Sequence, residues 1–187
     1  AFDKVGRMLG LPYPGGPHIE REAQHGNPIA FSFPRAMLQD DSYDFSFSGL
    51  KTAVMRAATV QPSARSRRER GAEKEAQLRS DVSVADVAAS FQAALIEILV
   101  EKTARAAAAY NVSEILLAGG VSANTTLRNK MRARTELPVR YPPLNLCTDN
   151  GAMIAAAAHY RLDEGLESPL SFDVTPMWPL SQNPYTE

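Results

Sequence analysis

One junction constrains the fold more than any other feature of the sequence: the stretch LLAGGVSANTTLRNKM, residues 116–131. An apolar run passes through Gly119 and Gly120 into a segment with helical spacing, which is typical of a buried parallel strand followed by a helix. We expect Ser122 to cap that helix and Asn124 to project from its first turn. The N–H groups at such a helix start can bind an anion, and glycines let a phosphate or a base approach the backbone. A tight turn that binds nothing explains the same pattern about equally well.

Helical and extended patterns alternate along the chain, which favours an α/β fold with a parallel sheet. Apolar residues at helical spacing predict helices over residues 1–11, 17–24, 48–58, 81–110, 122–134 and 148–162. Alternating or continuous apolar runs predict strands over residues 43–49, 114–120 and 137–142. So few strands for so many helices indicate that part of the sheet belongs to a segment outside this chain.

Composition and charge exclude several classes of protein. The net charge of the 187 residues is −1, so any attraction to nucleic acid must come from a local patch. Cys147 is the single cysteine, which excludes an internal disulfide and fits a reducing compartment. Apolar runs stay below the length of a membrane span, and the first ten residues carry charges where a signal peptide is apolar. We expect a cytoplasmic protein without membrane association.

The sequence begins without Met and inside a helical pattern, so we expect a piece of a longer chain. Residues 1–166 are predicted to form one α/β part, and residues 167–187 a tail rich in Pro and Ser. Within the first part, residues 61–81 have almost no apolar side chain and are expected to form a solvated linker or an exposed helix. Arginines in this segment can contact RNA phosphates, but the interleaved glutamates favour a solvated face.

A second junction, CTDNGAMIA, places a carboxylate at a predicted helix start. Thr148 is the expected cap, and Asp149 then lies in the first turn, where the helix dipole favours a negative charge. A capping acid is the simpler interpretation. The alternative is a hard oxygen ligand for a metal, which needs partners from elsewhere in the protein.

Two further glycine-containing junctions are weaker signals. DFSFSGLKTAV places Ser48, as a possible cap, and Lys51 at a predicted strand-to-helix turn, but it lacks the spacing of a phosphate-binding loop. A solvated lysine explains Lys51 equally well. Asp3, which precedes the Gly15-Gly16 turn, means little alone. The histidines lack the spacing of a helical zinc site and are expected to be isolated: His18, His25 and His159.

Four motifs in one order carry a resemblance: AFDKVGRMLGLPYPGGP, FSFSGLKT, AGGVSANTTLR and CTDNGAMIA. Together they resemble the TsaD family, also called the glycoprotease or Gcp family, in its bacterial form. The resemblance implies a helix-rich α/β lobe of the actin-like, Hsp70-like ATPase fold (ASKHA, RNase H-like), without the N-terminal lobe. It also implies an activity: transfer of a threonylcarbamoyl group from threonylcarbamoyl-adenylate to N6 of the adenosine 3′ of the anticodon of tRNA.

The family's functional residues carry over to positions that match its motifs. For the nucleotide or adenylate these are Asp3, Gly16, Gly119, Gly120 and Asn124, with Ser48 and Lys51 as further candidates. For the metal the matching residue is Asp149. The family's two histidine ligands lie in an H-x-x-x-H element that this sequence does not contain. No residue is assigned as catalytic, and we expect this chain alone to bind metal poorly and to be inactive.

The resemblance also implies cofactors and partners. These are one divalent metal, iron or zinc; ATP or threonylcarbamoyl-adenylate; tRNA; a paralogous actin-like subunit; and a small P-loop ATPase. Two alternatives remain open. One is a metallopeptidase, in line with the older name O-sialoglycoprotein endopeptidase, and the other is a non-catalytic partner-binding module, which is expected to form a homodimer through exposed strand edges.

Overall fold

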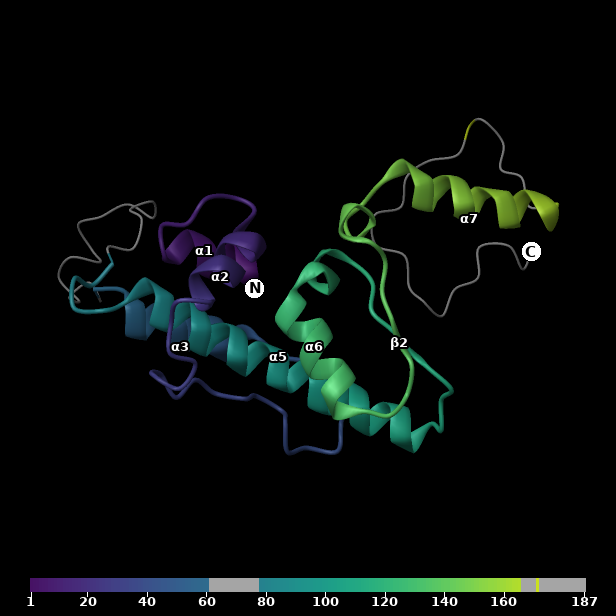
Figure 1. The fold of residues 1–187 in the computed structure, drawn as a ribbon. Coiled ribbons are helices and arrows are strands. Elements are labelled where there is room, and N and C mark those ends of the chain that lie inside the picture. The colour runs from purple at the N-terminus through teal and green to yellow at the C-terminus, as the bar shows by residue number, and fades with distance from the viewer. Residues whose placement is uncertain (61–77, 166–170, 172–187) are drawn as a thin grey trace. The chain divides into compact units, whose positions relative to one another are not determined.

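The computed structural model describes residues 1–60, 78–165 and 171. The chain divides into two compact units, Ala1–Cys147 and Thr148–Glu187 (Figure 1). The predicted tail, apart from residue 171, and most of the predicted linker, residues 61–77, lie outside the described residues. Among the helices of the described part, none combines the length and the apolar character needed to cross a membrane.

The first unit is built around one long helix, α5 (Val84–Ala109). The helices α1 (Phe2–Met8), α2 (Gly15–Ala23) and α3 (Ser48–Ala58) lie at its N-terminal end, and α6 (Thr125–Arg134) packs further along it (Figure 1). Ser83 caps α5 by accepting a hydrogen bond from the backbone N–H of Asp86. The predicted helices of this unit are confirmed, with ends displaced by a few residues.

Two apolar clusters divide the buried surface of α5 between its neighbours. Near the N-terminal end, Phe91 packs edge-on against Phe2 at 5.4 Å between ring centroids, and Leu95 lies in the same cluster. Further along, Ile96 and Val100 share a second cluster with α6 and the sheet. Because α5 contributes to both clusters, it fixes the position of α1 and α2 and also that of α6.

The sheet consists of two short parallel strands, β1 (Ile115–Leu116) and β2 (Val139–Arg140). Ile115 pairs with Val139 and Leu116 with Arg140, so the predicted parallel pairing is confirmed. The prediction of a buried strand holds for Ile115 only, because Leu116 is 67% exposed. Successive strand residues face opposite sides, and only the Ile115 side packs on the helices.

The strand predicted over residues 43–49 is wrong. Residues 43–47 form no strand, and α3 begins at Ser48. The ammonium of Lys102, on α5, donates to the carbonyl oxygens of Ser42 and Asp44, at 2.8 Å each. These two carbonyls therefore bind a side chain and not the backbone of a paired strand. Ser48 is not the predicted cap either, because Phe47 holds that position and no side chain caps α3.

Candidate functional site

The start of α2 is fastened to α1 by the first of the predicted site residues. Asp3 on α1 accepts a hydrogen bond from the backbone N–H of Gly15 through Oδ1, at 2.8 Å. A Cβ at Gly15 would lie 2.8 Å from the carbonyl oxygen of Phe2, so only glycine allows this close approach. Asp3 therefore has a structural role at the α2 start, and its side chain remains exposed.

Gly16, the next residue, differs from Gly15 in its surroundings. A Cβ built on Gly16 would meet no other atom within 4 Å, and the residue is half-buried. Packing therefore requires a glycine at position 15 but not at position 16. The absence of a side chain at Gly16 leaves open space beside the start of α2.

The same helix reaches α6 through Glu20, a residue that no sequence pattern indicated. Glu20 Oε1 accepts a hydrogen bond from the backbone N–H of Thr125, the first residue of α6, at 2.7 Å. Glu20 follows Gly16 by one helical turn, so the two residues share a face of α2. Two hydrogen bonds made by α2 therefore connect the Asp3–Gly16 turn to the start of α6.

The glycine pair before α6 forms a turn and a short 3-10 helix, η1 (Gly120–Ala123). Gly119 has φ +81°, a left-handed conformation that favours glycine, and a Cβ there would meet no atom within 4 Å. Gly120 is exposed at the start of η1. These two glycines therefore leave the backbone open on this side of the turn.

Asn124, rather than Ser122, caps α6. Its Oδ1 accepts from the backbone N–H of Leu127 at 2.9 Å, and its amide donates to Oε1 of Gln92 at 2.8 Å. Asn124 is only 6% exposed, and it precedes the helix instead of projecting from the first turn as predicted. The Oγ of Ser122 is buried and has no hydrogen-bond partner within the described part of the chain. Because Ser122 lies within η1, this hydroxyl belongs to the turn that precedes α6.

The expected anion site at the α6 start is partly filled by the protein itself. The N–H of Thr125 binds Glu20, and the N–H of Leu127 binds Asn124. One of the two amide hydrogens of Asn124 forms the hydrogen bond to Gln92, and the other remains to donate to a ligand. Gln92 is a buried polar residue on the apolar face of α5, and that break in the helical pattern is a signal that could have found it.

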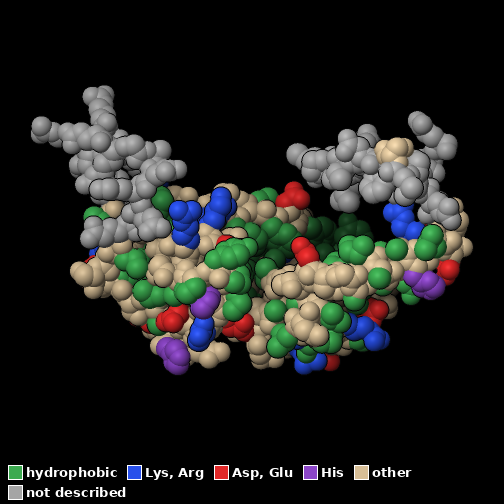
Figure 2. Space-filling view, turned by 90° about the horizontal axis from the view of Figure 1, so that it is seen from above, with side chains coloured by type: hydrophobic (Ala, Val, Ile, Leu, Met, Phe, Trp, Pro, Cys, Tyr) green, Lys and Arg blue, Asp and Glu red, His purple; other side chains and the backbone are tan. Residues whose placement is uncertain are grey.

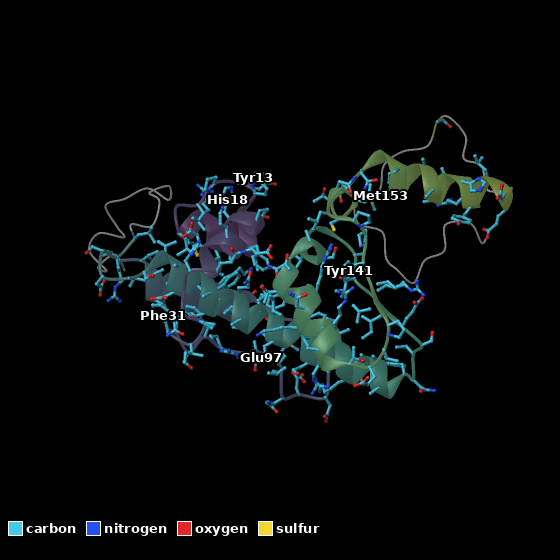
Figure 3. All side chains as sticks on the ribbon, viewed as in Figure 1. Tyr13, His18, Phe31, Glu97, Tyr141 and Met153 are labelled. Atoms are coloured by element: carbon cyan, nitrogen blue, oxygen red, sulfur yellow. The ribbon has the colours of Figure 1, made fainter. Side chains whose placement is uncertain are left out.

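Arg128 holds the glycine turn to the chain that follows β2. Its Nε donates to the carbonyl of Ser122, and its Nη2 lies 3.0 Å from the carbonyl of Pro142 and 3.1 Å from Sγ of Cys147. Its guanidinium carbon also lies 4.1 Å from the ring centroid of Tyr141, which lies between α6 and the chain around β2 (Figure 3). No sequence pattern singled out this residue.

The remaining nucleotide candidates, Ser48 and Lys51, lie in the first turn of α3. Ser48 is exposed and Lys51 is half-buried, and neither side chain makes a hydrogen bond to another described residue. Thr52 Oγ1 donates to the carbonyl of Ser48, which is an interaction within the helix. The structure describes no hydrogen bond from these side chains to α2 or α6.

In the second unit, α7 (Gly151–Asp163) begins two residues later than a Thr148 cap would require. Asn150 is the cap and accepts from the backbone N–H of Met153 at 3.0 Å, so the predicted capping by Thr148 is wrong. Asp149 therefore precedes the helix, where it is exposed. The side chains of α7 are also largely exposed.

The described residues do not fit a metal centre. No group of three or more His, Cys, Asp or Glu side chains comes together in residues 1–60 and 78–165. His18 contacts Arg21, and His159 lies 3.6 Å from Asp163. Asp149 supplies one carboxylate, and one carboxylate does not make a site for a divalent ion.

A shallow pocket lies away from the glycine turns. Its volume is about 390 Å³, and it lies between the end of α3 and residues 79–81. Its lining contains none of the predicted site residues: Arg56, Thr59, Val60, Arg79, Ser80 and Asp81. The candidate site is therefore defined by its turns and hydrogen bonds, not by this cavity.

The fold and these junctions define a class of protein: a helix-rich α/β protein whose glycine turns lie beside two helix starts. A family model described as TsaD, tRNA N6-adenosine threonylcarbamoyltransferase, matches residues 1–156. The chain belongs to the TsaD family, which confirms the resemblance found in the four motifs.

Curated relatives agree with this assignment. The chain is 50% identical to the tRNA N6-adenosine threonylcarbamoyltransferase of Moorella thermoacetica over 184 residues, which cover 97% of this chain and 50% of that protein. The protein of the same name from Thermomicrobium roseum is 49% identical over 185 residues, with 96% and 50% covered. That from Variovorax paradoxus is 45% identical over 187 residues, with 97% and 49% covered. The chain thus spans about half the length of the curated relatives it matches.

Proposed function

We propose that this chain supplies part of the adenylate-binding site of a tRNA N6-adenosine threonylcarbamoyltransferase. One observation carries the proposal: α2 is hydrogen-bonded at Gly15 to α1 and at Glu20 to the first residue of α6. This arrangement ties together the elements that bear Asp3, Gly16 and Asn124. Packing does not require the glycine at position 16, and the lack of a side chain there leaves room for a bound nucleotide.

In the proposed reaction the chain binds and orients the adenylate. N6 of the tRNA adenosine attacks the carbonyl carbon of the threonylcarbamoyl group, the bond from that carbon to the phosphate oxygen breaks, and AMP leaves as N6 loses a proton. Gly119 and Gly120 let the phosphate approach the backbone, and the remaining amide hydrogen of Asn124 donates to the nucleotide. Hydrogen-bond donors that the fold holds in place before the reaction stabilise the negative charge that develops on the leaving phosphate.

The whole enzyme requires more than the described residues provide. We propose that tRNA, a paralogous actin-like subunit and a small P-loop ATPase take part, in the cytoplasm. Asp149 is proposed as a single carboxylate ligand to a metal whose other ligands lie outside the described residues. No chemical step is assigned to that metal, because these residues do not form a centre for it.

Calorimetry with a non-hydrolysable ATP analogue tests the proposal on this chain. Gly16→Ala places a methyl group in the open space without meeting a protein atom, so the fold should remain intact and the binding heat should fall. Asn124→Asp keeps the oxygen that caps α6 but removes the amide donor and adds a negative charge, so it should also weaken binding. Arg7→Ala, an exposed change on α1, is the matched control.

Equal heats for wild type, Gly16→Ala and Asn124→Asp would contradict the proposal, and so would a wild type without measurable binding. Thermal unfolding of each variant shows whether a lost heat reflects a lost fold. A threonylcarbamoylation assay with the complete enzyme bearing the same substitutions then tests the proposed reaction. There the two site variants should lower turnover, and Arg7→Ala should not.

A further inference from the structure

Two arginines of α6 share one tyrosine ring. The guanidinium carbon of Arg128 lies 4.1 Å from the ring centroid of Tyr141, and that of Arg132 lies 4.8 Å from it. The two arginines are four residues apart and so lie on one face of the helix. Figure 3 shows Tyr141 between α6 and the chain around β2. We call Arg128, Arg132 and Tyr141 the arginine–tyrosine face.

No carboxylate in the described part of the chain neutralises either arginine of this face. The helix α6 carries four cations and no anion: Arg128, Lys130, Arg132 and Arg134. Arg134 is paired with Glu101 at 2.8 Å. Arg128 contacts carbonyl oxygens, a sulfur and the ring, none of which carries a full charge opposite to its own.

Arg132 has its hydrogen-bond donors unused. The side chain is exposed and donates to no described residue, and its guanidinium lies against the ring of Tyr141. Like charges four residues apart on a helix destabilise it, and the electron-rich ring face offsets this repulsion. The protein thus holds this guanidinium beside the ring, despite the repulsion from Arg128, and no described residue accepts a hydrogen bond from it.

Several kinds of anion can bind an exposed guanidinium, and here we favour the phosphate of a nucleic acid. The net charge of the chain is −1, and on the face seen in Figure 2 basic side chains lie in small groups among acidic and apolar ones. A nucleic acid would therefore be bound through a local contact and not by a broad field. A planar guanidinium fork matches the paired oxygens of a phosphate.

We propose that the arginine–tyrosine face contacts the phosphodiester backbone of the RNA substrate. This inference rests on the proposed function, in which the substrate is a tRNA. Arg128 also holds the carbonyl of Ser122, so the same side chain links this face to the glycine turn of the candidate nucleotide site. Arg132 makes the phosphate contact, and Tyr141 positions its guanidinium.

Fluorescence anisotropy with a labelled tRNA tests the inference across a salt series. Arg132→Ala should weaken binding roughly 3- to 10-fold and lower the slope of log K against log salt by about 0.7 to 0.9, as expected for one lost phosphate contact. Tyr141→Leu keeps every charge but releases the guanidinium, so it should weaken binding by a smaller factor. Tyr141→Phe keeps the ring and should bind as wild type does.

Lys130→Ala is the matched control, because Lys130 is an exposed cation on the same helix and does not contact the ring. Equal losses in Lys130→Ala and Arg132→Ala would indicate non-specific attraction and overturn the inference. Unchanged binding in Arg132→Ala, or a wild type that binds no tRNA, would also overturn it. Displacement of the tRNA by polyglutamate as readily as by unlabelled tRNA would indicate an acidic protein partner instead.

The ATP-analogue heats of the same variants separate this inference from the proposed function. These heats should not change in Arg132→Ala or Tyr141→Phe, because neither residue is assigned to the nucleotide. Normal heats together with unaffected tRNA binding would reject the arginine–tyrosine face and leave the nucleotide site standing. Absent heats in the wild type would reject the proposed function itself.

Discussion

Glu20 and Thr125 lie 105 residues apart in the sequence and are joined by a hydrogen bond of 2.7 Å between a carboxylate oxygen and a backbone N–H. The bond provides α6 with an acceptor for its first N–H and places a negative charge at the positive end of the helix dipole. It also fixes the distance between two glycine turns that come from separate motifs. The geometry of the candidate site therefore depends on a residue that lies in neither turn.

Glu20→Ala should lower the free energy of unfolding by about 0.5 to 1.5 kcal/mol, the usual contribution of a helix-capping hydrogen bond. The bond is exposed, so a value at the lower end is expected, and Glu20→Gln should lose less because an amide oxygen still accepts. Urea unfolding measures the change. Glu22→Ala on the same helix is the control, because the side chain of Glu22 makes no hydrogen bond or ion pair to a described residue. Equal effects of the two alanine changes would show that the bond to Thr125 contributes nothing.

Gly15 and Gly16 should respond differently to alanine. A Cβ at Gly15 would meet the backbone of Phe2 and Asp3 at 2.8 and 2.9 Å, so Gly15→Ala must separate α1 from α2 and should destabilise by about 1 to 3 kcal/mol. Gly16→Ala meets nothing and should be neutral or stabilising by up to about 1 kcal/mol, because alanine favours a helix. Thermal unfolding compares the two. A marked loss of stability in Gly16→Ala would remove the argument that its space is free for a ligand.

Much of the first unit could be predicted from local patterns. Apolar residues at helical spacing identified α5 nearly to its ends, because the residues at that spacing, such as Val87, Phe91 and Leu95, are buried. The parallel pairing of β1 with β2 followed from the alternation of strand and helix. The four motifs, in their order along the chain, identified the family. Amino-acid composition and hydrophobic periodicity alone could not have identified it.

The caps and the contacts between distant segments could not be predicted in this way. Ser122 and Asn124 are both good capping residues, and the choice between them depends on η1, a local turn without a sequence period. The same holds for Thr148 and Asn150. Glu20 and Arg128 act through partners that the fold alone brings near, so neither could be singled out from the sequence.

Lys102 offers a test of how the segment before α3 is held. Its ammonium is fully buried and binds Oδ1 of Asp40 at 3.0 Å as well as the carbonyls of Ser42 and Asp44. Lys102→Met keeps the volume of the side chain and removes all three bonds, so it should destabilise by roughly 2 to 4 kcal/mol, somewhat below the usual cost of breaking a buried pair because Asp40 is 43% exposed.

Urea unfolding checks this value, and hydrogen exchange of residues 42–47 should become faster in the same variant. Lys130→Met, at an exposed cation, is the control. A change below about 0.5 kcal/mol, the range of ordinary surface substitutions, would show that the three bonds are replaced by water without loss.

The carboxyl of Asp81 should have a pKa below its ordinary value, because it is paired with Arg79. Arg79 donates to both of its oxygens, at 3.1 and 2.6 Å, and these hydrogen bonds hold the pKa of Asp81 below its ordinary value of 3.8. A carboxyl whose folded pKa is lowered stabilises the protein above its unfolded pKa and loses that contribution as pH falls through the folded pKa. The contribution is therefore present at neutral pH and disappears on the acid side of pH 3.8.

Carbon-13 NMR of the Asp81 carboxyl over an acid titration measures this directly. Arg79→Gln should raise the pKa of Asp81 towards 3.8, because it removes the charged donor that is the largest cause of the shift. Arg56→Gln is the control. Arg56 lines the shallow pocket at the end of α3 together with Arg79 and Asp81, and its change should leave the pKa of Asp81 as in the wild type. If Asp81 titrates identically in wild type and in Arg79→Gln, the pair seen in the structure does not persist in solution.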